Sequence, residues 1–149
     1  MKQLKVSAIR EGTVIDHIPS DMTFKVVEIL KLDSVKEIIS VAANLDSKKT
    51  GKKGIIKIGG KFLGEDEVNK IALLAPIATL SIIKDFKVVE KNKLAMPKTV
   101  EGFVKCFNPN CVTNHEEIKT KFHVINQSPL KIRCHYCERA MGSNDIVLK

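Results

Sequence analysis

The chain has 149 residues, a formal net charge of +8 and a pI near 9.4. That length allows one ordinary domain or two small ones, and it excludes a large enzyme with a cofactor domain of its own. With 44% hydrophobic and 28% charged residues, the composition is that of a folded globular protein. The basic excess makes polyanions natural partners: nucleic acid, nucleotides or an acidic protein surface.

Membrane and export segments are not expected. The longest stretch without a charged residue, residues 71–83, is too short to span a bilayer and contains Pro76. The N-terminal sequence MKQLKVSAIREG lacks the apolar core of a signal peptide, so we expect a cytoplasmic protein with reduced thiols.

Two domains are expected because all four cysteines lie after residue 105. Between the two halves, the segment from Lys91 to Lys98 interrupts the periodicity and contains Pro97, as an interdomain connection would. We therefore expect one domain over residues 1–97 and a second over residues 98–149.

The first domain begins with an alternating segment that predicts a half-buried strand over residues 4–9. A turn at Glu11-Gly12 and a loop over residues 16–19 follow. Ser20 or Asp21 can then cap a helix that runs to about Lys31. The apolar residues expected on one side of this helix are Phe24, Val27 and Leu30.

Two further strands are predicted over residues 36–45 and 52–58, and a lysine-bearing turn joins them into a hairpin. Acidic residues after Gly64 mark the start of a second helix, which Pro76 ends. A last strand is expected over residues 79–89. The order βαββαβ predicts an α+β fold, a ferredoxin-like sandwich of a four-stranded antiparallel sheet with both helices on one face. The other face is then available for function.

The four cysteines form two close pairs, spaced C-x4-C and C-x2-C: Cys106, Cys111, Cys134 and Cys137. This pattern predicts one tetrahedral Zn²⁺ held by four thiolates, a closed and therefore structural site. Two disulfides or a redox C-x2-C are the alternatives. His115, His123 and His135 are expected to be ordinary surface residues. A domain of about fifty residues with short strands would need the metal to fold, so we expect a small all-β zinc-binding domain.

Six lysines between Lys48 and Lys61 occur without an acidic residue among them. Such a run is usually a solvated turn. Strand periodicity, however, places Lys53, Ile55 and Lys57 on one face and Ile56 and Ile58 on the other. If the isoleucines pack on the helices, two ammonium groups project from the open face.

A triphosphate could lie between these cations, with the Asp16 carboxylate accepting from ribose hydroxyls and His17 nearby. The ordinary alternatives are that Asp16 caps a turn and that His17 is merely exposed.

Two function classes compete. An RNA-binding protein would share this sheet topology and a zinc ribbon, but it needs aromatic residues on the open face, and the expected strands supply none. A nucleotide-sensing subunit needs only the cationic face. No nucleophile and base pair, no Gly-rich phosphate loop and no open metal site are found, which argues against an enzyme.

Several motifs resemble the regulatory chain of aspartate carbamoyltransferase: GTVIDHIP at 12–19, IIKI at 55–58, LAPIAT at 74–79 and the two cysteine spacings. The resemblance covers nearly the whole chain. It implies a non-catalytic allosteric subunit in pyrimidine biosynthesis, whose N-terminal domain forms a homodimer and binds CTP or ATP. It also implies that the zinc domain docks on trimers of catalytic chains.

The resemblance further implies the residues of the nucleotide site, with Asp16 at the ribose, His17 near phosphate, and backbone groups of Ile83 and Phe86 at the base. The full implied set is Val6, Ala8, Ile9, Asp16, His17, Lys53, Lys57, Ser81, Ile83, Phe86, Val88 and Lys91. Ser7, Ser81 and Phe86 depart from the family, where an acidic residue, an amide and a tyrosine are familiar.

Overall fold

The computed structural model describes residues 8–48, 51–127 and 129–149. The chain divides into two compact units, Met1–Ala95 and Met96–Lys149. Strand content dominates both units, and the pairings between strands are antiparallel. The expected α+β fold class is confirmed.

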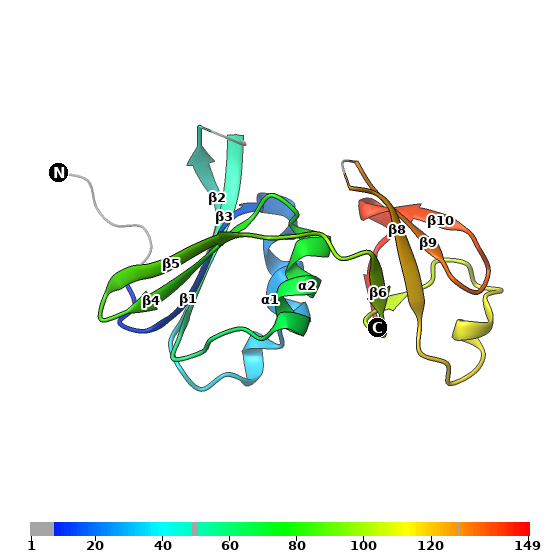
Figure 1. Cartoon of the computed structure of the whole chain (residues 1–149), viewed down its shortest axis with the longest axis horizontal. Helices are drawn as coiled ribbons and strands as arrows, with labels where there is room; N and C mark the ends of the chain where they lie inside the picture. Colours follow the sequence, from blue (N-terminus) through cyan, green and yellow to red (C-terminus); the bar gives the residue numbers. More distant parts are fainter. Residues whose placement is uncertain (1–7, 49–50, 128) are drawn as a thin grey trace. The chain divides into compact units, whose positions relative to one another are not determined.

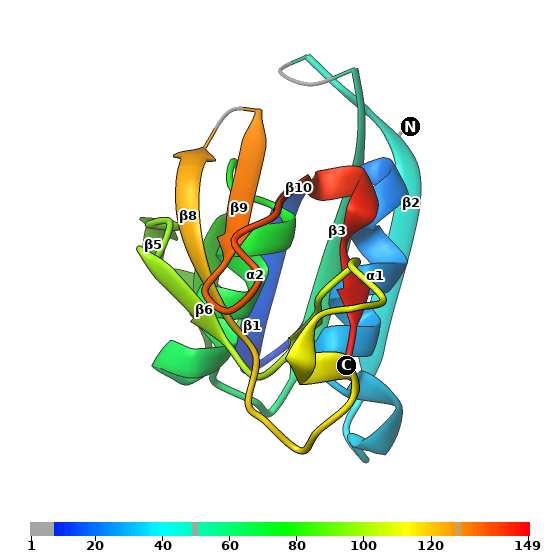
Figure 2. The ribbon, with the colours of Figure 1, turned by 90° about the vertical axis from the view of Figure 1, so that its right-hand side faces the viewer.

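The N-terminal unit is one antiparallel sheet with two helices on one face (Figures 1 and 2). Its helices are α1 (Thr23–Ile29) and α2 (Glu65–Leu74), with 3-10 turns at Ser20–Met22 and Leu32–Ser34. Its strands are β1 (Gly12–Pro19), β2 (Ile39–Ser47), β3 (Gly51–Gly59), β4 (Thr79–Lys84) and β5 (Lys87–Lys93). The order β2-β3-β1-β4-β5 contains the four strands of the ferredoxin-like arrangement and adds β5 at one edge.

Alternation along β3 decides which face of the sheet is covered. Ile56 and Ile58 are fully buried, whereas Lys53, Ile55 and Lys57 on the opposite face are half-buried. This division of the strand was predicted and is confirmed. The helices contribute to the same core, whose fully buried side chains include Ile15, Ile18, Val26, Ile56, Ile58, Ile71 and Leu73.

Gly54 brings α1 close to β3. A Cβ on this glycine would overlap the Thr23 hydroxyl oxygen, and Thr23 is fully buried at the start of α1. Any side chain at residue 54 would therefore push the helix away from the sheet.

The start of the N-terminal sheet differs from the sequence prediction. Residues 4–7 of the strand predicted over residues 4–9 lie outside the described residues, Ala8 and Ile9 are not in a strand, and the first strand among the described residues is β1 over Gly12–Pro19. The predicted loop at residues 16–19 is wrong because these residues belong to β1, whereas the chain bends at residues 10 and 11, next to the predicted turn at Glu11-Gly12. A β-bulge at Asp16 and His17, with His17 at φ 60°, lets both Ile15 and Ile18 face the core despite their spacing of three.

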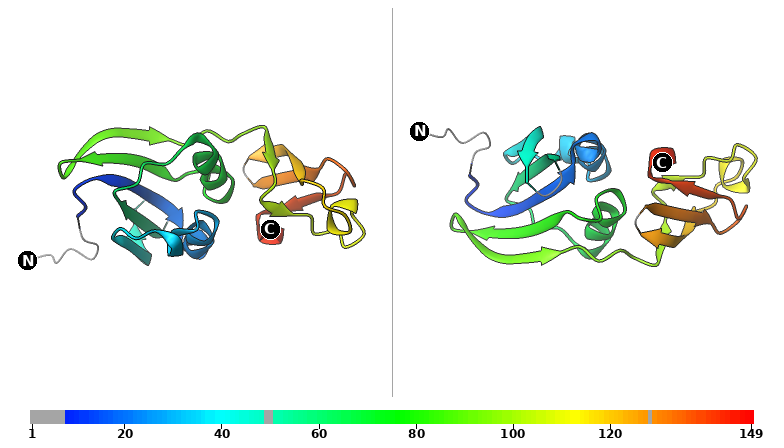
Figure 3. Two further views of the ribbon diagram at one scale, coloured as in Figure 1. Left: turned by 90° about the horizontal axis from the view of Figure 1, so that it is seen from below. Right: turned by 90° about the horizontal axis from the view of Figure 1, so that it is seen from above.

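The last predicted strand is two strands. β4 and β5 form a hairpin through Asp85 and Phe86, which Figure 3 shows as a long ribbon. Both turn residues have positive φ, 53° and 64°, as a two-residue type I′ turn requires. Neither is glycine, so the sequence carried no turn signal there, and the sheet has five strands instead of four.

The first helix also differs from its prediction. Neither Ser20 nor Asp21 caps it, because both lie in the preceding 3-10 turn. The buried face consists of Val26, Ile29 and Leu30, whereas Phe24 is 67% exposed. The second helix starts at Glu65 after Gly64 and ends at Leu74, as predicted.

The C-terminal unit is all β with two short 3-10 turns, Val112–Asn114 and Ser143–Asp145. Its strands are β6 (Thr99–Glu101), β7 (Val104–Lys105), β8 (Lys121–Gln127), β9 (Leu130–Cys134), β10 (Ala140–Gly142) and β11 (Val147–Leu148). They form a four-stranded sheet in the order β10-β9-β8-β6 and a separate β11-β7 pair. The apolar core is small and centres on Val104, Phe122, Ile132 and Ile146.

None of the helices among the described residues has the length and apolar character needed to cross a membrane.

Candidate functional site

A cavity of about 310 Å³ lies on the open face of the N-terminal sheet. Strands β1, β3, β4 and β5 form its floor, the β4-β5 turn forms one end, and the residues before β1 complete the wall. The lining residues are Ala8, Ile9, Val14, Asp16, Ile55, Lys57, Thr79, Ser81, Ile83, Phe86, Val88 and Lys91.

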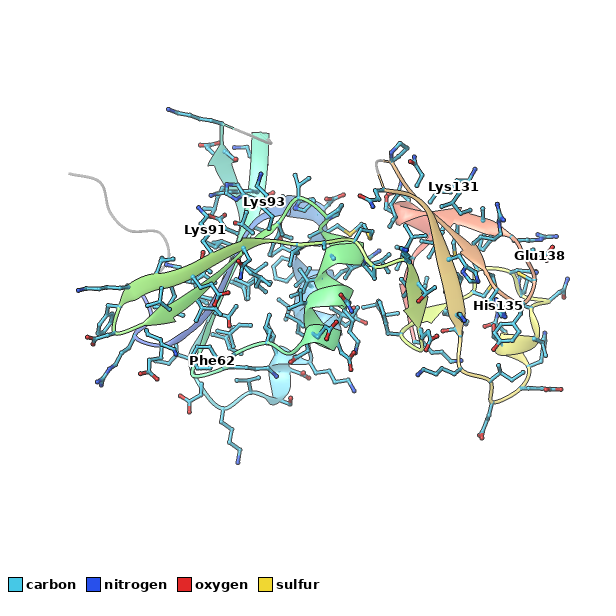
Figure 4. The ribbon with its side chains drawn as sticks, in the orientation of Figure 1. Phe62, Lys91, Lys93, Lys131, His135 and Glu138 are labelled. Carbon is cyan, nitrogen blue, oxygen red and sulfur yellow. The ribbon has the colours of Figure 1, made fainter. Side chains whose placement is uncertain are left out.

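Two lysines stand on opposite sides of this floor. Strand pairing puts Lys57, Val14, Ser81 and Lys91 in one row across β3, β1, β4 and β5. Adjacent strands are about 4.8 Å apart, so the backbones of the two lysines are separated by about 14 Å. Figure 4 shows Lys91 on β5. An anionic ligand that lies over Val14 and Ser81 would have Lys57 on one side and Lys91 on the other.

One end of the cavity is polar because of the bulge in β1. The Asp16 carboxylate accepts from the Lys53 ammonium at 2.8 Å and from the His17 backbone N–H at 2.6 Å. His17 Nδ1 lies 3.2 Å from the Thr79 hydroxyl. Burial raises the pKa of Asp16, but the Lys53 ammonium and the His17 N–H outweigh it, so the pKa lies below its ordinary value. Asp16 is thus an ionised acceptor at neutral pH.

The other end of the cavity is apolar. Ile83 and Val88 are cross-strand partners, and Phe86 follows in the turn with its side chain 64% exposed. The Phe86 backbone N–H donates to the carbonyl of Arg10 at 2.9 Å, which ties the turn to the segment before β1. The cavity therefore changes along the strands from a polar end to an apolar end, as a nucleotide does from its ribose phosphate to its base.

Nine of the twelve residues implied for a nucleotide site line this cavity. Lys53 and His17 lie beside it, bonded to Asp16 and Thr79 respectively. Val6 lies outside the described residues. Sequence reasoning missed the lining residues Val14, Ile55 and Thr79, although strand alternation from Lys57 and from Ser81 points to the last two.

The lysine run between residues 48 and 61 is partly neutralised by acidic residues from elsewhere. Lys53 pairs with Asp16, Lys52 with Asp46 at 2.5 Å, and Lys61 with Glu67 at 3.2 Å. Lys49 lies outside the described residues. Among the described lysines of the run, Lys57 alone lines the cavity, so these lysines do not form one cationic patch there.

The four cysteines meet in the C-terminal unit. Their sulfur atoms all lie within 4.8 Å of one another, with Cys106 3.6 Å from Cys137 and Cys111 3.7 Å from Cys134. Four sulfurs at about 2.3 Å from a tetrahedral Zn²⁺ are about 3.8 Å apart, so the cluster fits zinc. The same distances are far longer than the S–S bond of about 2.05 Å, which removes the disulfide alternative.

Backbone and side-chain hydrogen bonds hold the turns that carry these sulfurs. The Asn114 side-chain amide donates to the carbonyls of Cys106 at 3.0 Å and Asn108 at 2.8 Å. The Thr113 hydroxyl lies 3.1 Å from the sulfur of Cys111. Such supporting contacts orient metal ligands.

The metal-free thiols differ in acidity. Burial raises the pKa of Cys106 and of Cys134. Burial also raises the pKa of Cys137. Hydrogen bonds with the Arg139 backbone, the Asn108 side chain and the neighbouring thiols outweigh this effect and lower the pKa to about 7. Because zinc binds thiolates, metal uptake must release the protons held by Cys106 and Cys134.

Family models match both units. Residues 4–95 match "Aspartate carbamoyltransferase regulatory chain, allosteric domain", and residues 98–147 match "Aspartate carbamoyltransferase regulatory chain, metal binding domain".

Similar proteins named aspartate carbamoyltransferase regulatory chain extend over nearly the whole length. The protein from Pyrococcus abyssi is 57% identical, and that from Pyrococcus horikoshii is 58% identical, each over 99% of this chain and 98% of its own length. The protein from Bacteroides thetaiotaomicron is 48% identical over 97% of this chain and 95% of its own length.

Proposed function

The chain belongs to the family of aspartate carbamoyltransferase regulatory chains, and from this premise we propose how its two units divide the work of regulation. The N-terminal unit, Met1–Ala95, binds CTP or ATP, and the C-terminal zinc unit, Met96–Lys149, docks on trimers of catalytic chains. The family consists of regulatory, non-catalytic chains, so the expectation that the chain is not an enzyme is confirmed. An RNA-binding function is not supported.

The observation that supports nucleotide binding is the cavity on the open face, which is polar at one end and apolar at the other. We place the base against Ile83, Phe86 and Val88, the ribose next to it over Val14 and Ser81 with its hydroxyls toward Asp16, and the triphosphate beside the ribose within reach of Lys57 and Lys91. An RNA-binding sheet would instead need several aromatic platforms, and among the described lining residues only Phe86 is aromatic.

Calorimetry of the full chain with CTP and with ATP tests this proposal. Lys57→Ala and Lys91→Ala should each weaken binding about 10-fold to 100-fold, because each removes a charged hydrogen-bond donor. Lys52→Ala is the matched control, since Lys52 pairs with Asp46 and does not line the cavity. Unchanged affinity in both cavity variants would refute this assignment of the site.

Partner binding is a separate part of the proposal. We expect the catalytic chain of aspartate carbamoyltransferase to copurify with this chain from the cytoplasm, and Lys57→Ala to leave that assembly intact. Homodimerisation through the N-terminal unit is supported by two sheet edges, β2 and β5, that have no further partner strand among the described residues. Sedimentation of the isolated chain at the mass of a monomer would contradict the dimer.

Allosteric control then requires that a nucleotide bind unequally to two states of the assembly. Such a coupling is typically about 1–3 kcal/mol. The proposal therefore predicts that substrate bound to the catalytic chains changes nucleotide affinity by the same factor by which the nucleotide changes substrate affinity.

A further inference from the structure

Two histidines of the C-terminal unit face each other at hydrogen-bond distance. His123 lies in β8, and His135 directly follows β9, where Figure 4 labels it. His123 Nε2 and His135 Nδ1 are 3.0 Å apart; His135 is exposed and His123 is half-buried. Sequence analysis treated both as ordinary surface residues, and the cysteine cluster uses neither.

The strand register brings the pair together. His123 pairs with Arg133, and the His135 backbone N–H continues the ladder by donating to the Lys121 carbonyl at 2.8 Å. His135 is therefore diagonal to His123 on the same face of the β8-β9 hairpin, a distance that aromatic side chains can bridge. The neighbouring Cys134 is buried and points to the opposite face, so the pair is separate from the zinc site.

Contacts around the pair hold the rings in place. The Tyr136 ring packs edge-on against the His135 ring, with centroids 5.2 Å apart and planes at 88°. The Tyr136 hydroxyl points to the Lys119 carbonyl at 3.5 Å. The two imidazoles are themselves 5.2 Å apart and tilted by 49°.

The charged groups that the strand register places on this face are Arg133, Lys121 and Glu101. Lys121 lies 4.0 Å from the Glu101 carboxylate, which offsets part of its charge. The positive charge of Arg133 repels a cation at this face. A cation must therefore be held by coordination bonds, because charge attraction alone does not favour its binding.

The distance between the ring nitrogens suits such coordination. Two nitrogens at about 2.05 Å from one metal ion are about 2.9 Å apart at a square-planar angle and about 3.3 Å apart at a tetrahedral angle. The observed 3.0 Å lies between these values, so small adjustments of the two rings suffice to direct both lone pairs at one ion. Imidazole nitrogen is a preferred ligand of Zn²⁺, Cu²⁺ and Ni²⁺.

We propose that His123 and His135 form a bidentate surface site for a late first-row divalent metal ion, distinct from the four-cysteine cluster. Water or a side chain of a bound partner completes the coordination. The site gives the C-terminal unit a second metal whose exchange does not require the zinc unit to unfold.

Titration of the zinc-loaded full chain with Ni²⁺ tests the proposal, with zinc content measured before and after. Wild-type chain should bind one Ni²⁺ saturably. His123→Ala and His135→Ala should each weaken binding about 100-fold, because the loss of one ligand converts a chelate into a single contact. His115→Ala should bind like wild type, since His115 bonds to the Pro109 carbonyl and has no second imidazole beside it.

His123→Gln separates coordination from hydrogen bonding, because a glutamine amide can still bond to His135 but is a poor nickel ligand. His123→Gln should therefore weaken Ni²⁺ binding as much as His123→Ala does. If His135→Ala loses zinc, the two variants at residue 123 still decide the question. At substoichiometric Ni²⁺, paramagnetic broadening should reach the ring signals of His123 and His135 before those of His17 and His115. Absence of saturable binding, or wild-type affinity in His123→Gln, would overturn the site.

Discussion

The Lys53 ammonium lies 2.8 Å from the Asp16 carboxylate, at the residue where β1 bulges beside the open-face cavity. The bulge turns Asp16 and His17 toward this face, and β3 supplies the lysine from the neighbouring strand. One backbone irregularity therefore fixes the polar end of the cavity and sets the charge of its only lining carboxylate among the described residues.

This ion pair predicts a specific titration. The pKa of Asp16 in the folded chain lies below its ordinary value of about 3.9, so the pair stabilises the fold above that pH. The contribution is lost as the pH falls through the folded-state pKa. The His17 amide proton, bonded to the carboxylate, reports this titration in NMR spectra. Its midpoint should lie below about 3.9.

Lys53→Ala should move this midpoint upward, because burial raises the pKa of Asp16 once the ammonium is gone. Lys52→Ala should leave the midpoint unchanged, since Lys52 pairs with Asp46 at an exposed position. Equal midpoints in wild type and Lys53→Ala would show that the pair does not hold the carboxylate in solution.

Packing of α1 on the sheet gives a second prediction. Gly54→Ala places a methyl group against the buried Thr23, so overpacking should destabilise the chain by about 1–3 kcal/mol. Gly64→Ala is the control, because no atom lies within 4 Å of a Cβ there. Urea unfolding followed by circular dichroism gives both values. A Gly54→Ala chain as stable as the control would mean that α1 shifts without cost.

The covered and open faces of β3 were predictable because period-two alternation is local: Ile56 and Ile58 are apolar, and Lys53 and Lys57 are not. The cysteine cluster was predictable for a similar reason, since short spacings bring two sulfurs of a pair to one ion. In contrast, the bulge at Asp16 depends on tertiary packing that draws Ile15 and Ile18 into one core. No local signal records it, and residues 16–19 were therefore predicted to form a loop.

The β4-β5 turn could not be predicted from the sequence, for a different reason. Asp85 and Phe86 both adopt positive φ, and phenylalanine is not a residue that predicts such a turn. The hydrogen bond from Phe86 to the Arg10 carbonyl joins residues far apart in sequence and stabilises the turn. The missed turn also hid the added edge strand β5, which carries Lys91.

Metal removal gives a third prediction. Because the C-terminal unit has a small core and four converging sulfurs, stripping zinc should unfold it while the N-terminal sheet persists. Amide NMR signals of residues 98–149 should collapse to unfolded positions, and returning zinc should restore them. Sedimentation should then show that catalytic chains dissociate while the N-terminal dimer remains. An intact assembly after complete metal removal would refute the docking role of the zinc unit.

The Asn114 side chain gives the last prediction, because it donates to two backbone carbonyls in the turn that carries Cys106 and Cys111. Asn114→Ala leaves both carbonyls without this donor and loosens the turn, so zinc affinity should fall about 10-fold to 100-fold. Asn126→Ala is a matched control, since its amide makes one comparable bond, to the Pro129 carbonyl, away from the cysteines. Competition with a zinc-binding dye measures both variants. If Asn114→Ala holds zinc as tightly as Asn126→Ala, the four thiolates alone determine the geometry of the site.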